Sequence, residues 1–364
     1  MQIDHNGTLK IFITGGAGFV GSNVSMALAA RYPEAEIIVY DNFSRAGSEL
    51  NIPRLEAKGV RVVRGDVRHF EDMKKAGEMA SLIIDCAAEP SVMAGHAGSG
   101  VEPRDLVDIN FGGTFNCLEL ARGSQASVLF LSTSRVYPIE ALNALPLIEQ
   151  EARFELEKEV DGASREGVTE LFTLSGARSL YGATKLSSEQ IIAEYASMYG
   201  IKAVISRSGV IAGPWQFGKT DQGIVSLWVA RHFFNSKPLS YIGFGGEGKQ
   251  VRDILHIDDL IEALVWQLDH FDLCTGNIFQ IGGGSQNAIS LRELTAICQK
   301  VTGNILPIAS DPATRPGDIR WYVSDHTKFT NLSKWSPQRR VSKVVEDTYS
   351  WMQEHKEEVE RILA

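Results

Sequence analysis

Residues 11–21 read Ile-Phe-Ile-Thr-Gly-Gly-Ala-Gly-Phe-Val-Gly, a β-rich apolar run that passes directly into a glycine cluster. The pattern predicts a strand over 10–14 and a helix from the cluster to about Arg31. Glycines at such a junction permit a tight turn and let a pyrophosphate approach the backbone N–H groups at the helix N-terminus. We therefore predict cofactor contacts at Gly15, Gly18, Phe19 and Val20.

The glycine spacing is G-x-x-G-x-x-G, which departs from the general G-x-G-x-x-G fingerprint. A glycine cluster alone would also fit a purely structural turn. Its position between a predicted strand and a predicted helix favours a dinucleotide site.

Short apolar runs alternate with helical patterns through the first half of the chain. The predicted strands cover 36–40, 60–64, 82–85, 127–132 and 202–207, and the predicted helices cover 105–123 and 181–198. Such alternation is typical of an α/β fold with a Rossmann-type, doubly wound parallel sheet and helices on both faces.

The second half is irregular, with glycine-rich stretches at 211–223 and 243–249 and helical patterns at 290–302 and 341–354. We predict a Rossmann domain over 1–207 plus about 250–275, and a smaller, interleaved C-terminal α/β lobe over 208–249 and 276–364. The acid-rich stretch 138–179 is unusually long for a connection, and it predicts either a functional lid or a disordered segment.

Composition excludes several classes of protein. The 364 residues are 44% hydrophobic and 22% charged, as in an ordinary globular protein, and their net charge is −9. This balance argues against nucleic acid or an acidic membrane as a partner. The first residues lack a signal-peptide pattern, and no run approaches the roughly 18 apolar residues of a membrane span. Four widely spaced cysteines without a C-x-x-C pair predict a reduced, cytoplasmic protein with no metal site.

Asp41 ends the second predicted strand, where a carboxylate can accept hydrogen bonds from both ribose hydroxyls of a dinucleotide. The same charge would repel a 2′-phosphate, which favours NAD over NADP. Arg45 lies close by in the sequence and could weaken this preference.

Two further positions fit the same cofactor. Asp66, after the third strand, could accept a hydrogen bond from the adenine amino group, or it could cap a turn. Ala87 and Ala88, after the fourth strand, would leave room for the nicotinamide, or they could be ordinary core residues.

Tyr181 and Lys185 lie four residues apart on a predicted helix, so their side chains share one face. A free tyrosine has a pKa of about 10, and lowering it to about 7 requires about 4 kcal/mol of preferential stabilisation of the phenolate. A nearby ammonium provides stabilisation of that kind. Upstream, residues 131–137 close a predicted strand with hydroxyls that could bond a reacting oxygen. The alternatives are a helix-surface pair and a Ser/Thr-rich turn.

Together these motifs resemble the extended short-chain dehydrogenase/reductase superfamily, in particular its NAD-dependent sugar-nucleotide epimerases and dehydratases. The resemblance runs from about Leu9 to Trp351. It implies a catalytic triad of Thr133, Tyr181 and Lys185, in which Tyr181 is the acid/base and Lys185 also holds the nicotinamide ribose.

The resemblance also implies further contacts. It places one group of residues near the cofactor and a second group at the substrate. The second group includes arginines, whose forked guanidinium groups suit the oxygens of a diphosphate. The two arginines of the substrate group, Arg252 and Arg315, could instead each form an ion pair with a neighbouring Asp. The additional cofactor residues are Asn42, Ser44, Val67, Asn110 and Ser132, and the substrate residues are Thr133, Gln216, Gln222, Arg252 and Arg315.

Three stretches, 41–48, 216–223 and 248–256, are most similar to the CDP-paratose (CDP-tyvelose) 2-epimerases. That similarity implies a nucleotide-sugar substrate that is transiently oxidised at C2, turns over as a keto-sugar and receives the hydride on its other face. It also implies NAD that is tightly bound, because NADH never has to leave.

Departures from the family pattern narrow the function. Thr133-Ser134-Arg135 stands where the 4,6-dehydratases carry Thr-Asp-Glu, so elimination of water lacks its acid and base. Val210 replaces an asparagine of the UDP-galactose 4-epimerases, and Leu180 replaces a common proline. The alternatives are a UDP-sugar 4-epimerase, a non-catalytic NAD(H) sensor and a net reductase. Relatives pair through the helices that correspond to 105–123 and 181–198, which predicts a homodimer or homotetramer.

Overall fold

The structure is a computed structural model that describes residues 9–218, 222–235 and 238–363. The chain divides into two compact units. The first contains the residues up to Thr133, Leu180–Arg207 and Ile261–Ile278. The second contains Ser134–Ser179, Ser208–Leu260 and the residues from Phe279 onward.

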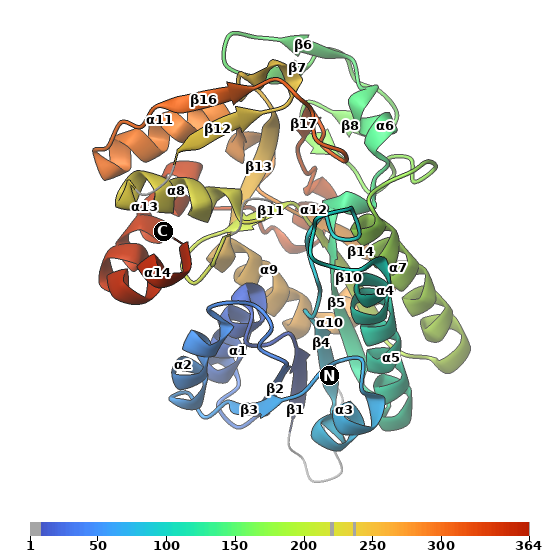
Figure 1. The fold of residues 1–364 in the computed structure, drawn as a ribbon. Helices are drawn as coiled ribbons and strands as arrows, with labels where there is room; N and C mark the ends of the chain where they lie inside the picture. The colour runs from blue at the N-terminus through green and yellow to red at the C-terminus, as the bar shows by residue number, and fades with distance from the viewer. Residues whose placement is uncertain (1–8, 219–221, 236–237, 364) are drawn as a thin grey trace. The chain divides into compact units, whose positions relative to one another are not determined.

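The first unit contains most of a seven-stranded sheet with the strand order β14-β10-β5-β4-β1-β2-β3 (Figure 1), and the edge strand β14 begins at the last residue of this unit. The ladders that join β3, β2, β1, β4 and β5 are parallel, and the order reverses at β1, as in a Rossmann-type sheet. This confirms the predicted doubly wound α/β fold. The strands are β1 (Lys10–Thr14), β2 (Glu36–Asp41), β3 (Arg61–Arg64), β4 (Leu82–Asp85), β5 (Ser127–Thr133), β10 (Ala203–Ser208) and β14 (Ile278–Ile281).

Strands β1, β4 and β5 are almost wholly buried, so both faces of the sheet are covered. On one face Phe12, Ile83 and Val128 join a core cluster with residues of α5 and α7. On the opposite face α1 contacts β1 and β2. The helical segments are α1 (Phe19–Arg31), η1 (Ser48–Asn51), α2 (Ile52–Glu56), α3 (Phe70–Gly77), α4 (Pro103–Val107), η2 (Asp108–Gly112), α5 (Gly113–Ser124), α7 (Leu180–Tyr199), α9 (Ile257–Asp269) and α10 (Phe271–Cys274).

The second unit contains short sheets around β13, which pairs in parallel with β11 and β17 and antiparallel with β15. Separate two-stranded sheets join β12 with β16, β6 with β7, and β8 with β9. The strands are β6 (Leu147–Glu149), β7 (Phe154–Leu156), β8 (Ala163–Ser164), β9 (Gly167–Val168), β11 (Val210–Ala212), β12 (Leu239–Ile242), β13 (Val251–His256), β15 (Ala288–Ser290), β16 (Ile308–Asp311) and β17 (Trp321–Tyr322).

The helices of this unit include α11, whose predicted start is fixed by a capping box. Ser290 Oγ accepts from Glu293 N–H at 3.1 Å, and the Glu293 carboxylate accepts from Ser290 N–H at 2.8 Å. The helical segments are η3 (Ser134–Val136), α6 (Ile139–Asn143), α8 (Ile224–Phe234), η4 (Phe244–Gly246), η5 (Ser285–Asn287), α11 (Leu291–Thr302), α12 (Thr327–Ser333), α13 (Val341–Glu354) and α14 (Lys356–Leu363).

The stretch 138–179 differs from the sequence prediction, because it is ordered and groups with the second unit. Its backbone bonds to distant strands of that unit: Phe154 N–H donates to the Lys249 carbonyl, and Val168 N–H donates to the Val323 carbonyl. The prediction of a disordered segment is therefore wrong. The same long-range bonding explains why the division of the chain differs from the predicted domain boundaries at 134–179, and residues 250–260 also fall in the second unit.

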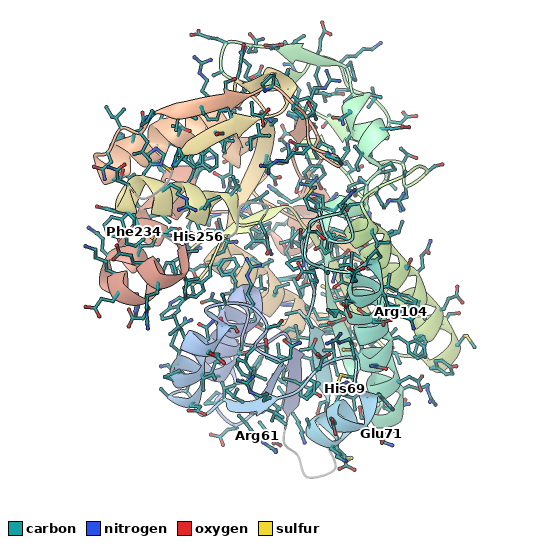
Figure 2. The ribbon with its side chains drawn as sticks, in the orientation of Figure 1. Arg61, His69, Glu71, Arg104, Phe234 and His256 are labelled. Atoms are coloured by element: carbon teal, nitrogen blue, oxygen red, sulfur yellow. The ribbon has the colours of Figure 1, made fainter. Side chains whose placement is uncertain are left out.

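Charged side chains are spread over the surface of the first unit, where Arg61 and Arg104 point outward (Figure 2). Arg61 lies 3.7 Å from Glu36, and Arg104 lies 3.1 Å from Asp108, one turn along the chain. Exposed pairs of this kind contribute little to stability. Within the described part of the chain, no helix is long and apolar enough to cross a membrane.

Gly21 provides a test of the packing between the first turn of α1 and the glycine cluster. A Cβ atom at Gly21 would lie 2.6 Å from Gly16 Cα and even closer to the Gly15 carbonyl oxygen. We expect Gly21→Ala to lower the free energy of unfolding by about 1–3 kcal/mol in urea titrations. Gly123→Ala is the matched control: it lies on α5 with nothing within 4 Å of the new Cβ, and it should be neutral or stabilising. Equal effects of the two substitutions would contradict this packing.

Candidate functional site

The carboxyl ends of the parallel strands bring the predicted cofactor residues to one edge of the sheet. The glycine turn follows β1, Asp41 ends β2, Asp66 follows β3, Ala87 follows β4 and Thr133 ends β5. In open α/β sheets this edge, at the reversal of strand order, is where ligands bind.

The glycine turn is tightly built. Gly15 has φ +62°, and a Cβ there would lie 2.7 Å from Ala87 Cα, so the turn runs against the segment that follows β4. Gly18 N–H donates to the Gly15 carbonyl at 3.1 Å, and Gly18 is the N-cap of α1 without a side-chain cap. Phe19 and Val20 open the helix and are half-buried. An uncapped helix N-terminus behind a glycine turn suits a phosphate group.

Asp41 braces this turn. Its carboxylate accepts from Ala17 N–H at 3.0 Å and from Phe43 N–H at 2.8 Å. Burial raises the pKa of Asp41 above its ordinary value, although these N–H donors act in the opposite sense. Gly18 N–H also acts on this carboxylate. A carboxylate has about four lone-pair positions, so these backbone bonds leave room for a ribose hydroxyl.

Asp66 has a partner that the sequence analysis missed. Arg68 grips its carboxylate through Nε at 3.0 Å and Nη2 at 2.8 Å, and Asn42 Nδ2 donates to it at 3.0 Å. The Arg68 guanidinium holds the pKa of Asp66 well below its usual range. Arg68 also bonds Asp105 at 3.2 Å. A contact between Asp66 and adenine stays a prediction.

The neighbouring predicted residues have structural partners as well. Val67 is buried in the core cluster, and its carbonyl accepts from Asn116 Nδ2 at 2.7 Å. Ser44 is exposed, and its N–H donates to Asn42 Oδ1 at 3.0 Å. Arg45 is half-buried, and its carbonyl accepts from Ser48 Oγ at 2.7 Å.

Asn110 joins three segments of the first unit. It lies in η2, a π-helical turn, and its amide bonds both the N–H and the carbonyl of Glu89, at 2.8 and 3.1 Å. Its Nδ2 also donates to Thr184 Oγ1 on α7 at 3.2 Å. Asn110 therefore holds the segment after Ala87 and Ala88 against α7, and π-turns of this kind are frequent at functional sites.

The three predicted catalytic residues all lie in the first unit. Thr133 is the last residue of β5, while Tyr181 and Lys185 lie on the first turns of α7, which contacts β5. Tyr181 is 8% exposed and Lys185 is 2% exposed, so the alternative of a helix-surface pair is wrong. Lys185 Nζ lies 4.0 Å from the centre of the Phe130 ring. Burial lowers the pKa of Lys185, and the carboxylate of Asp85 is the strongest opposing influence.

A buried ion pair supports this group of residues. Glu189, one turn after Lys185, accepts from Arg207 Nε at 2.9 Å and from Arg207 Nη2 at 2.5 Å. Ser132 Oγ donates to the same carboxylate at 2.5 Å. Arg207 and Glu189 are both buried, so the pair ties the ends of β5 and β10 to α7. The sequence analysis missed this ion pair. Two features of the sequence could have indicated it: Glu189 lies four residues after Lys185, and Arg207 is a charged residue at the end of the predicted strand 202–207.

These observations fit NAD. The cradle at Gly15 and Gly21 has no space for side chains, the first turn of α1 has no side-chain cap among the described residues, and Asp41 keeps lone pairs for hydroxyl donors. The described residues contain no cluster of three His, Cys, Asp or Glu side chains suited to a metal ion.

The other predicted substrate residues lie in the second unit. Gln216 donates to the Ile211 carbonyl at 2.8 Å and accepts from Ser226 Oγ at 2.7 Å, so its amide braces the loop before α8. Gln222 Oε1 is buried and has no hydrogen-bond partner among the residues that the structure describes. Lys219, Thr220 and Asp221, from the similar stretch 216–223, lie outside the described residues.

Arg252 forms an ion pair with Asp318 at 3.0 Å. The sequence analysis allowed an ion pair with an adjacent Asp, and the partner is Asp318 rather than the chain neighbour Asp253. Burial lowers the pKa of Arg252 to about 10, so it stays protonated at neutral pH. Arg135 Nη1 donates to the Gly317 carbonyl at 3.2 Å, and its charge acts on Arg252. Arg315 is half-buried and opens the turn that carries Asp318.

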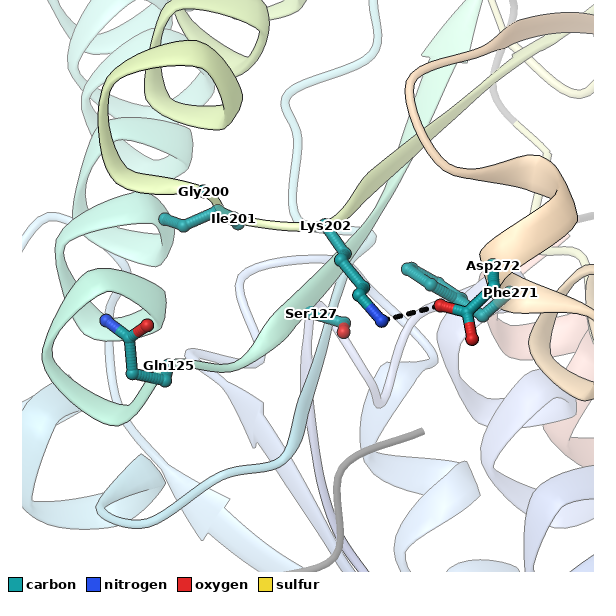
Figure 3. Close-up of a pocket in the computed structure, with 7 residues that line it drawn as sticks. All are labelled: Gln125, Ser127, Gly200, Ile201, Lys202, Phe271 and Asp272. Atoms are coloured by element: carbon teal, nitrogen blue, oxygen red, sulfur yellow. Dashed lines mark hydrogen bonds and ion pairs between the residues drawn. The ribbon is translucent and has the colours of Figure 1, made fainter.

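A small pocket lies elsewhere in the first unit, at the amino-terminal ends of β5 and β10 (Figure 3). Lys202 and Asp272 form an ion pair at 2.6 Å there. The cofactor edge is at the opposite ends of these strands, so this pocket is not the predicted site. It is lined by Gln125, Ser127, Gly200, Ile201, Lys202, Phe271 and Asp272.

Comparison with known proteins agrees with this geometry. CDP-paratose 2-epimerase of Salmonella typhi is 31% identical over 94% of this chain and 99% of its own length. The dTDP-glucose 4,6-dehydratase of Mycobacterium tuberculosis is 26% identical over 88% of this chain and 90% of its own. The structure of UDP-glucuronic acid 4-epimerase from Bacillus cereus, in complex with UDP-glucuronic acid and NAD, superposes with a TM-score of 0.78. It shares 25% identity, covering 95% of this chain and 100% of that one.

The profile of the NAD dependent epimerase/dehydratase family matches residues 11–282. The chain therefore belongs to that family and is an NAD-dependent enzyme of the sugar-nucleotide epimerase and dehydratase class.

Proposed function

We propose that this protein is a nucleotide-sugar epimerase that inverts C2 of a CDP-linked sugar. The similarity to CDP-paratose 2-epimerase over nearly the whole of both chains carries this proposal. Ser134 and Arg135, where the dehydratases have Asp and Glu, argue against elimination of water.

The first unit would provide the chemistry. When bound, NAD accepts a hydride from the sugar carbon and returns it. The phenol oxygen of Tyr181 takes the proton of the adjacent sugar hydroxyl and later gives it back. Lys185 provides the positive charge that favours the phenolate, and Thr133 Oγ1 donates a hydrogen bond to the sugar oxygen. Gly15, Gly18 and Asp41 would hold the pyrophosphate and a ribose of the cofactor.

Arg252 and Arg315 would hold the substrate diphosphate. Arg252 keeps its charge while half-buried, and a guanidinium fork bonds phosphate oxygens more strongly than water does in such surroundings. Asp318 holds the Arg252 fork in place. Gln222, whose buried Oε1 has no partner among the described residues, is a further proposed contact.

A UDP-sugar 4-epimerase is the rival function, and the similarity to the UDP-glucuronic acid 4-epimerase structure favours it. Both reactions use the same triad and cofactor, so the reacting carbon distinguishes them. A non-catalytic NAD sensor would have no need for Thr133, Tyr181 and Lys185 together. The predicted cytoplasmic location stays a prediction.

Tyr181→Phe removes the proposed proton carrier and leaves the ring. We expect turnover of CDP-paratose to fall at least about a hundredfold, the usual contribution of general acid/base catalysis. NAD released from the denatured protein should match the wild type. Tyr199→Phe, the same change at the other end of α7, should keep full activity. Equal turnover by wild type and Tyr181→Phe would contradict the proposed role of Tyr181.

Deuterium in the substrate identifies the reacting carbon. Turnover of CDP-paratose labelled at C2 should be slower than that of unlabelled substrate, whereas a label at C4 should have no primary effect. The same measurements on UDP-glucose and UDP-glucuronic acid are the control. Isotope sensitivity at C4 alone would replace the first proposal with the 4-epimerase.

We also propose a homodimer formed through α5 and α7, which lie side by side (Figure 1). Phe115 on α5 and Tyr199 on α7 are 40% and 42% exposed although both are large and apolar. Sedimentation equilibrium should give twice the mass of the chain for the wild type and a lower mass for Phe115→Glu. A wild-type mass equal to one chain would contradict the proposal.

A further inference from the structure

Lys185 is a costly charge in the first unit, because an ammonium that is 2% exposed has lost almost all of its water. The proposed function needs this ammonium to stay protonated while Tyr181 carries a negative charge. Titratable groups face it from three elements and a loop: Asp85 from β4, Cys86 from the segment directly after β4, Cys117 from α5, and Glu189 from α7 itself. Burial raises the pKa of both thiols, so the two carboxylates are the candidate counterions.

Glu189 is already neutralised. Its carboxylate is held by both ends of the Arg207 fork and by Ser132 Oγ. The pair of Glu189 and Arg207 has no net charge, and the influence of Glu189 on the pKa of Lys185 is smaller than that of Asp85.

Asp85 is held differently. It is 1% exposed and accepts from Thr14 Oγ1 at 2.8 Å. Thr114 Oγ1 lies 2.7 Å from the same carboxylate, and its single proton also has the Asn110 carbonyl as an acceptor at 2.9 Å. Both partners are neutral hydroxyls, which do not cancel the charge of a carboxylate.

The ladder places Asp85 on the same face of the sheet as Lys185. Asp85 pairs with Phe130 in the parallel register of β4 and β5, so their side chains point to the same side. Lys185 Nζ lies 4.0 Å from the centre of that Phe130 ring. Among the described residues no ion pair joins Asp85 directly to Lys185, so the attraction acts at longer range between two buried groups, where charges are weakly screened.

We propose that Asp85 is the counterion of Lys185, a positioning residue that keeps the ammonium charged beside Tyr181. This inference rests on the proposed role of Lys185 in epimerisation. Lys185, Asp85, Glu189 and Arg207 then form a buried layer without net charge.

The test is the pH dependence of kcat/KM. Activity should fall at alkaline pH as Lys185 loses its proton, and Asp85→Asn should move this alkaline limb lower by roughly one pH unit or more. Thr114→Val is the matched control, because it removes one hydroxyl donor of Asp85 but keeps the charge. Its alkaline limb should stay where the wild type has it. A folded Asp85→Asn with an unchanged limb would overturn the proposal.

A second readout needs no turnover, so it separates this inference from the proposed function. Burial lowers the pKa of Lys185 below the 10.5 of free lysine. The protonated ammonium therefore costs folding stability, which should be regained as pH rises from the folded pKa toward 10.5, relative to Lys185→Met. The same comparison is made between Asp85→Asn and Asp85→Asn/Lys185→Met. There the difference in urea midpoint should begin to rise at a pH roughly one unit lower than in the comparison of wild type with Lys185→Met. The same starting pH in both comparisons would contradict the inference.

Asp85→Asn could also fail to fold, because it leaves the ammonium without a counterion. In that event Asp85→Asn/Lys185→Met should recover folding, since it removes both charges. A double variant as unfolded as the single one would assign Asp85 a packing role and overturn the proposal.

Discussion

The hydrogen-bond ladder of the parallel sheet is the constraint on which the rest of the first unit depends. It brings the carboxyl ends of β1, β2, β4 and β5 to one edge and fixes which side chains share a face. The register sets Thr14, Asp85 and Phe130 in one row, and helices α5 and α7 cover that row. Because a shift of one residue would turn each side chain to the opposite face, the same register that fills the core also positions the charged groups.

The carboxylates of the candidate site are partly or fully buried, and each of them is held by hydrogen-bond donors of the protein. Asp41 is bonded by backbone N–H groups, Asp66 by Arg68, and Glu189 by Arg207. Each carboxylate is held before any ligand arrives, which reduces the reorganisation that binding would require. Burying these charged groups costs folding free energy, and core packing on both faces of the sheet offsets that cost.

The sequence predicted those parts of the structure in which the signal is local. The strand–glycine–helix junction and the helix from Tyr181 onward both follow from patterns within about twenty residues. The stretch 138–179 was not predictable in this way, because Phe154 and Val168 bond to strands far along the chain. Likewise, the position of Asp66 after a predicted strand suggested a contact with the cofactor, but the sequence could not show that Arg68 bonds its carboxylate.

The two buried acids near Lys185 illustrate why composition alone does not define a site. A guanidinium fork satisfies the lone pairs of Glu189 and also cancels its charge, so that carboxylate serves to hold β5, α7 and β10 together. The hydroxyls of Thr14 and Thr114 lie against Asp85 and, being neutral, leave its charge intact. If a cation held Asp85 instead, the field at Lys185 would vanish and burial would favour the neutral amine. The choice of hydroxyl donors at Asp85 is therefore part of what allows an ammonium to exist in this interior.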